Sequence, residues 1–136
     1  MTTPNEAREA IYLVFDTAWA GATSVAYANE KLDTTTLSEW VRFEVVHVGS
    51  TQQTLGAVTN RKFRRVAFAT ANIFIEGDEG TARGDALAKI VRDAFEGTEI
   101  SGTTVFFKDV IVRELGSSDR WFEYSVEAEL EYTETK

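Results

Sequence analysis

The sequence predicts a single α+β domain, residues 1–136, with a mainly antiparallel sheet of four to five strands and two helices packed on one face. Two segments, at the start of the chain and near residue 90, carry apolar residues at helical spacing. The remaining apolar segments are rich in β-branched and aromatic residues, as strands are. The order helix, three strands, helix, two strands favours helices gathered on one face of an antiparallel sheet.

The first helix is expected over residues 3–20. Thr3, Pro4 and Glu6 fit the N-cap, N1 and N3 positions of a capping box. Gly21 is expected to end the helix. Apolar residues follow helical spacing between these ends: Ala7, Ile11, Val14, Phe15 and Ala18. A short strand is then expected over residues 24–28, followed by a loop.

Two longer strands are expected in the middle of the chain, over residues 40–48 and 61–77. Residues 49–60 between them are polar and punctuated by glycine, which predicts a functional arm or a mobile loop. Small residues on one face of the second strand would let a helix lie close to the sheet: Ala67, Ala69 and Ala71. Its other face carries Val66, Phe68 and Phe74, so the strand is expected to be covered on much of both sides.

The last part of the chain predicts a helix and a β-hairpin. Thr81 is a candidate N-cap for a helix that ends before Gly97. Its apolar stripe is Leu87, Ile90, Val91, Ala94 and Phe95. Strands are expected over residues 103–115 and 120–133, joined by a turn at GSSD, residues 116–119.

The final strand alternates between apolar and acidic positions. Its even positions, from Phe122 to Tyr132, are apolar and are expected to face the helices. Its odd positions form an acidic stripe: Glu123, Glu127, Glu129 and Glu131. Carboxylates about 7 Å apart repel by only ~0.6 kcal/mol in water, so a solvated sheet face tolerates this stripe. The alternatives are a wall beside DNA or a neighbouring subunit, and, less favoured on a flat strand, paired catalytic carboxylates.

A basic run lies at the start of the longest strand: Arg61, Lys62, Arg64 and Arg65. Three interpretations are open, namely salt bridges to the acids of another subunit, contact with phosphates, and a solvated edge. A chain that carries both a basic run and an acidic stripe has self-complementary surfaces, which can close a ring. Trp121 is the tryptophan expected at an interface, because alternation places it on the acidic, outward face.

Composition narrows the function classes. A net charge of −8 and a pI near 4.7 disfavour a protein that coats nucleic acid. The chain has no cysteine, so it has neither disulfides nor thiolate metal sites, which fits a reducing cytosol. The N-terminus lacks a basic n-region, so no secretory signal is expected, and no apolar run approaches the ~18 residues of a membrane span.

Catalytic motifs are not recognisable in the sequence. His47 is the only histidine, and it is interpreted as a structural or surface residue. One histidine and no cysteine give no basis for a Ser-His-Asp or Cys-His arrangement. The glycine clusters GDEG, residues 77–80, and GTARGD, residues 80–85, lack the Gly-Lys-Ser/Thr ending of a P-loop.

Four stretches together resemble a known family. They are TPNEAREAIYLVFDTAW, WVRFEVVHVGSTQQTLG, RKFRRVAFATANIFI and FKDVIVRELGSSDRWFEYSVEAELEYTE. In order and approximate spacing they are similar to the tail terminator-like proteins of phages with long non-contractile tails, the siphovirus type. The likeness covers nearly the whole chain and depends on the collinear set, not on one motif.

The resemblance implies a structural protein with no enzymatic activity and no cofactor. It implies a homo-oligomer, a hexameric ring on the finished tail tube, that stops tube growth and joins the neck or head-completion protein. Genomic DNA would pass through the hole without sequence-specific binding. The location implied is the head-proximal end of the virion tail, after assembly in the host cytoplasm, with no membrane partner.

Other functions stay open beside the resemblance. One is another ring-forming neck or head-completion protein of the same virion. A small carboxylate-dependent enzyme and a nucleic-acid binder acting through the basic run are the others. Phe106 and Ile111 make the penultimate strand more apolar than a solvent-facing strand should be. They predict either burial against a neighbouring subunit or a bulge in the strand.

Overall fold

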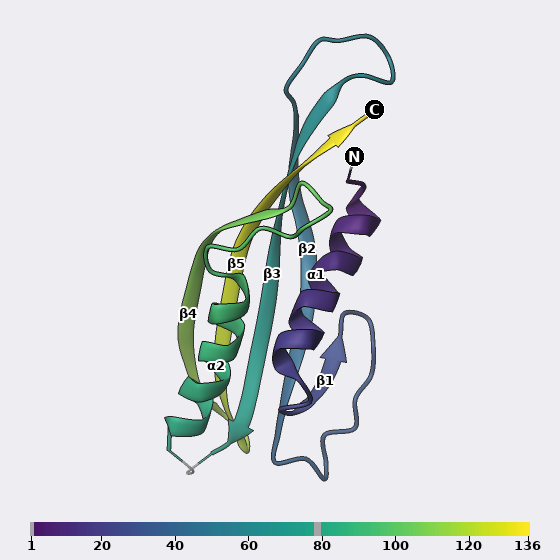
Figure 1. Cartoon of the computed structure of the whole chain (residues 1–136). Helices are drawn as coiled ribbons and strands as arrows, with labels where there is room; N and C mark the ends of the chain where they lie inside the picture. The colour runs from purple at the N-terminus through teal and green to yellow at the C-terminus, as the bar shows by residue number, and fades with distance from the viewer. Residues whose placement is uncertain (1, 78–79) are drawn as a thin grey trace.

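The computed structural model describes residues 2–77 and 80–136, and its elements follow the predicted order (Figure 1). The helices are α1 (Pro4–Trp19) and α2 (Ala82–Phe95). The strands are β1 (Ser24–Tyr27), β2 (Glu39–Gln52), β3 (Lys62–Glu76), β4 (Phe106–Ser118) and β5 (Trp121–Thr135). They form one five-stranded sheet in the order β1-β2-β3-β5-β4. Only β1 and β2 pair in parallel, so the α+β prediction with a mainly antiparallel sheet is confirmed.

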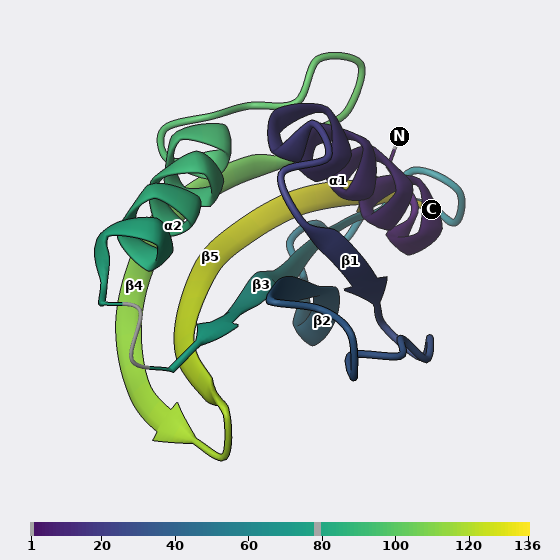
Figure 2. The ribbon, with the colours of Figure 1, turned by 90° about the horizontal axis from the view of Figure 1, so that it is seen from below.

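Both helices cover the same face of the sheet, α1 over β2 and α2 over β4 and β5 (Figures 1 and 2). The even positions of β5 face them, as the alternation predicts. Five of these side chains are at most 1% exposed: Tyr124, Val126, Ala128, Leu130 and Tyr132. The predicted small residues of β3 are buried beside them, since Ala67, Ala69 and Ala71 are also at most 1% exposed. The core therefore lies between the helices and this face.

The two helices begin differently. At α1 the predicted capping box is present, because Thr3 Oγ1 accepts from the Glu6 N–H at 3.2 Å and Glu6 Oε2 accepts from the Thr3 N–H at 3.1 Å. At α2 the predicted N-cap residue, Thr81, is in place, but its side chain makes no capping hydrogen bond. Thr81 has a helical backbone, φ −108° and ψ −9°, and an N-cap side chain normally needs an extended backbone to reach the first N–H groups.

Helix α2 lies close to β5 because its first turn holds a glycine. A Cβ on Gly84 would lie 2.3 Å from the Cε1 atom of Tyr124, which is closer than any tolerated contact. The Tyr124 hydroxyl donates to Asp85 Oδ1 at 3.0 Å. Burial, followed by this hydrogen bond, raises the pKa of Tyr124 to about 12. Tyr124 therefore links the start of α2 to the sheet, through its hydrogen bond to Asp85 and its packing against Gly84.

Two predicted segment boundaries need correction. Residues 49–60 are not all loop, since β2 continues to Gln52 past a bulge between His47 and Gly49, and Gln52 pairs with Phe63 of β3. The backbone ladder explains the extension, because polar residues pair as well as apolar ones where a partner strand continues. Similarly, β4 extends through the predicted turn to Ser118, and the turn falls on residues 119 and 120.

We call residues 49–65 the arm. It contains the end of β2, the connecting loop and the start of β3, and it extends beyond the ends of both helices (Figure 1). Backbone hydrogen bonds order its base, from the Gln53 N–H to the Lys62 carbonyl at 2.8 Å and from the Arg61 N–H to the Lys136 carbonyl at 3.0 Å. The arm is thus a continuation of the sheet and not a separate loop.

Candidate interaction surfaces

The acidic stripe lies on the sheet face opposite the helices, which we call the outer face. Its four glutamates alternate with the buried positions of β5, as expected. The expected solvation is wrong for Glu131, which is only 8% exposed. The other three are partly buried. The side chains of the acidic stripe are therefore not fully exposed to solvent.

Cations from the two neighbouring strands cover part of the stripe. Arg64 of β3 and Lys108 of β4 place their nitrogens 2.7 and 3.0 Å from Glu131 Oε1. Arg113 of β4 lies 3.1 Å from Glu127 Oε2. The hydrogen bond to Glu131, followed by its charge, raises the pKa of Lys108. The two carboxylates are thus already paired within the chain, which leaves them a poor catalytic pair.

The basic run is divided between the two faces, because it lies on a strand. Arg64 points to the outer face, where it meets Glu131. Arg65 points to the helix-covered face, where its Nη2 atom lies 2.6 Å from Glu134 Oε1 and its guanidinium also contacts Ser50. Arg61 donates to the Gly56 carbonyl at 2.9 Å inside the arm. The run therefore does not form one continuous patch for phosphate, and Lys62 is its exposed member.

Trp121 lies on the outer face, as alternation predicts, and is partly buried. The Arg120 guanidinium lies 4.3 Å from the centre of its ring, a cation–π contact. On the other side Trp121 meets the edge of Trp40 at 6.3 Å, and Trp40 stacks on Phe74 at 4.1 Å. This aromatic cluster explains the partial covering. A role for Trp121 at an interface stays a prediction.

His47 packs near the N-terminal end of α1. Its ring meets the ring of Tyr132 edge-on at 5.7 Å, and Arg8 Nη2 lies 3.3 Å from its Nδ1 atom. Burial, followed by the charges of Arg8 and Arg65, lowers the pKa of His47. Because Arg8 can only donate, Nδ1 is the acceptor and the proton of the neutral ring is on Nε2. These contacts fit the interpretation as a structural residue.

Strand β4 forms an open edge of the sheet. Among the described strands it pairs only with β5, whereas the opposite edge is the four-residue β1. Its register shifts twice, between Phe107 and Val110 and between Glu114 and Gly116, which fits the alternative of a bulge; burial against a neighbouring subunit stays a prediction. Exposed apolar side chains nevertheless remain along it: Phe106 at 40%, Ile111 at 46%, Val112 at 37% and Leu115 at 54%.

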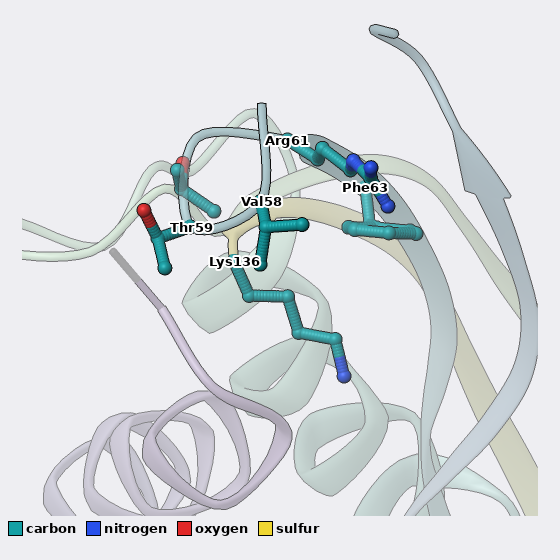
Figure 3. A pocket seen from close by; sticks show the side chains of 6 residues that line it. Val58, Thr59, Arg61, Phe63 and Lys136 are labelled. Carbon is teal, nitrogen blue, oxygen red and sulfur yellow. The ribbon is translucent and has the colours of Figure 1, made fainter. Parts of the chain in front are cut away.

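The arm carries apolar side chains that the sequence analysis missed, because it treated this segment as polar. Leu55 is 97% exposed and Val58 is 71% exposed. Val58 lies beside a hollow of about 600 Å³ at the base of the arm, with Phe63 and the Lys136 side chain around it (Figure 3). Arg61, Thr59 and Thr135 complete its lining. The sequence signal was the LGAV stretch, residues 55–58, inside a polar context.

Within residues 2–77 and 80–136, no three histidine, cysteine or acidic residues gather as a metal site would need. No helix there has both the length and the hydrophobicity to cross a membrane. Of the glycine clusters, residues 78 and 79 of GDEG lie outside the described residues, and GTARGD leads into α2.

Comparison with known proteins indicates the fold and not the function. The chain matches no family model, and no curated protein matches it significantly. A solved structure whose name carries no functional term is similar to it, with a TM-score of 0.64 and 17% sequence identity. The likeness covers 91% of this chain and 94% of that one. At this identity the similarity establishes a shared fold alone.

Proposed function

We propose that this chain is a structural protein of a phage or prophage tail, a tail terminator. It forms a ring, a hexamer in the family that it resembles, on the end of the tail tube. The ring stops polymerisation of the tube protein and presents a surface to the neck or head-completion protein. The observation that carries this proposal is the collinear sequence resemblance over nearly the whole chain.

The surface chemistry supports a protein that assembles. An open strand edge and exposed apolar residues outside the core are typical of surfaces that another chain covers. The arm extends beyond the helices and carries further exposed apolar side chains. Glu127 and Glu131 are paired with cations, which disfavours the alternative of a carboxylate-dependent enzyme.

Tube assembly in the presence of this chain tests the proposal. The tail tube protein of the same phage would be polymerised with increasing amounts of the purified chain, and tube lengths would be measured by electron microscopy. A terminator binds tube ends, so the mean length should fall as the ratio of chain to tube protein rises. Gold label on the chain should lie at one end of each tube.

The outcome separates the proposal from its nearest alternative. A neck or head-completion protein would bind only tubes that are already terminated, and it would leave the length distribution unchanged. Label spread along the tube wall, or tubes of unchanged length at every ratio, would contradict the proposal. A matched control is Leu13→Ala, on the exposed side of α1, which should shorten tubes as the unchanged chain does.

A further inference from the structure

The arm has a charge opposite to that of the rest of the molecule. Residues 49–65 contain four cations, Arg61, Lys62, Arg64 and Arg65, and no aspartate or glutamate. The whole chain carries −8, so the residues outside the arm carry −12, the difference between −8 and +4. The apolar side chains of Leu55 and Val58 lie in the same segment. Arg64 and Arg65 are already paired with Glu131 and Glu134 of their own chain, whereas no ion pair of Arg61 or Lys62 is found among the described residues. With these two cations and its exposed apolar side chains, the arm is suited to a surface that is both acidic and apolar.

The open edge of β4 is such a surface. Ile111 and Leu115 are about half exposed, at 46% and 54%. Asp109 and Glu114 of the same strand are also exposed. The two cations of this stretch, Lys108 and Arg113, are paired with Glu131 and Glu127 of the acidic stripe, so the acids are the charges left for a partner. At the start of β4 the far side is covered, because Phe106 forms an isolated bridge with Glu99 and the Phe107 N–H donates to the Thr98 carbonyl at 3.0 Å. Beyond Phe107, the far side of β4 has no partner strand among the described residues. An edge of this kind binds extended segments of another chain.

Arg64 at the base of the arm and Lys108 of β4 share Glu131, but the loop of the arm, which carries Leu55 and Val58, lies apart from Ile111 and Leu115 within one molecule. Strands β3 and β5 stand between β2 and β4 in the sheet, and the arm extends past the helices, away from the length of β4 (Figure 1). The acidic stripe is a less suitable partner, because Glu127 and Glu131 already have cations from their own chain. The complementary surface is therefore on a second copy.

We propose that the arm of one copy binds the β4 edge of the next copy. Leu55 and Val58 cover Ile111 and Leu115, and Arg61 and Lys62 approach Asp109 and Glu114. The contact joins two different patches, so successive copies associate head to tail, and such a contact closes into a ring when the rotation between copies allows it. This inference rests on the proposed function for the ring, but it has a test of its own.

The absence of cysteine makes that test direct. Two populations with different affinity tags would be prepared, one with Leu55→Cys and one with Ile111→Cys. They would be mixed and treated with a short thiol cross-linker. The proposed contact predicts a mixed dimer several-fold more abundant than either homodimer. A chain that carries both substitutions should give a ladder of higher oligomers.

The matched control replaces Ile111→Cys with Leu13→Cys, on α1, where the leucine is 66% exposed. This partner should give only the background yield. Equal yields with the two partners, or no mixed dimer at any concentration, would overturn the proposed contact. The contact would also be overturned if no mixed dimer formed and the chain bound duplex DNA in a way that Lys62→Glu abolished. The arm would then be a DNA-binding segment.

The failures of the two proposals can be distinguished. Rings in the micrographs without a mixed dimer would refute the arm contact and leave the ring intact. A mixed dimer together with unchanged tube lengths would support the contact and refute the tail terminator function.

Discussion

The two faces of the sheet differ in what surrounds their side chains. On the helix-covered face, the side chains of β5 from Tyr124 to Tyr132 are at most 1% exposed and contact α2 and neighbouring strands. On the outer face, the same strand presents glutamates, two of them paired with cations of β3 and β4. Strands β2 and β4 leave apolar side chains 40–47% exposed there, namely Val46, Ile111 and Phe106.

The difference shows which face maintains the fold and which is available to other chains. Burial of apolar side chains stabilises the first face, and no partner is needed to complete it. The outer face is folded, but it still exposes apolar area that burial would stabilise. We therefore expect substitutions on the helix-covered face to affect folding, and substitutions on the outer face, on the β4 edge or in the arm to affect assembly.

The largest expected effect is the contrast between two phenylalanines. Phe43 is 0% exposed and stacks on Phe15 at 4.0 Å. Phe43→Ala should lower the free energy of unfolding by about 4 kcal/mol, because it opens a cavity in the core. Phe106→Ala on the outer face should lower it by less than about 1 kcal/mol. Urea unfolding at a concentration where the chain is monomeric measures both, and equal losses would remove the contrast.

The next effect concerns the close approach of α2 to the sheet. Gly84→Ala should lower the free energy of unfolding by about 2 kcal/mol, because the added Cβ collides with the ring of Tyr124. Gly49→Ala is the control, since a Cβ there meets nothing within 4 Å. Thermal unfolding followed by circular dichroism compares the two variants. A Gly84→Ala chain as stable as the control would show that helix and sheet separate at little cost.

The ion pairs of the outer face give a smaller effect. Glu131→Gln should lower the free energy of unfolding by about 1 kcal/mol, because Arg64 and Lys108 lose their shared partner but stay partly in water. Glu129→Gln is the matched control, since no ion pair of Glu129 is found among the described residues. Urea unfolding in low and high salt should show the difference shrinking as salt rises.

The smallest effect is a pH dependence from the helix-covered side. The pKa of His47 is lowered in the folded chain, so the unfolded chain binds more protons just below pH 6.5. The stability linked to His47 is complete above pH 6.5 and is lost as pH falls toward the folded pKa. His47→Gln should therefore lose less stability than the unchanged chain between pH 7.5 and 5.5. Identical losses would show that the pKa of the His47 imidazole is the same in the folded and the unfolded chain.

Much of the fold was predictable because it depends on local patterns. The capping box at Thr3 and Glu6 and the alternation from Phe122 to Tyr132 are both visible in the sequence. The surfaces were less predictable, since they depend on strand register. Arg64 meets Glu131 only because β3 pairs with β5, and Lys108 reaches it past a bulge in β4. No local signal in the sequence fixes those contacts.

The central claim, that this chain closes into a ring through surfaces outside the helix-covered face, is tested most directly by negative-stain electron microscopy of the purified chain. Particle mass would be determined in parallel over a range of concentrations, with and without the tube protein. We expect closed rings of about six copies, as the family resemblance implies. A monomer at every concentration, including in the presence of tube ends, would contradict the claim.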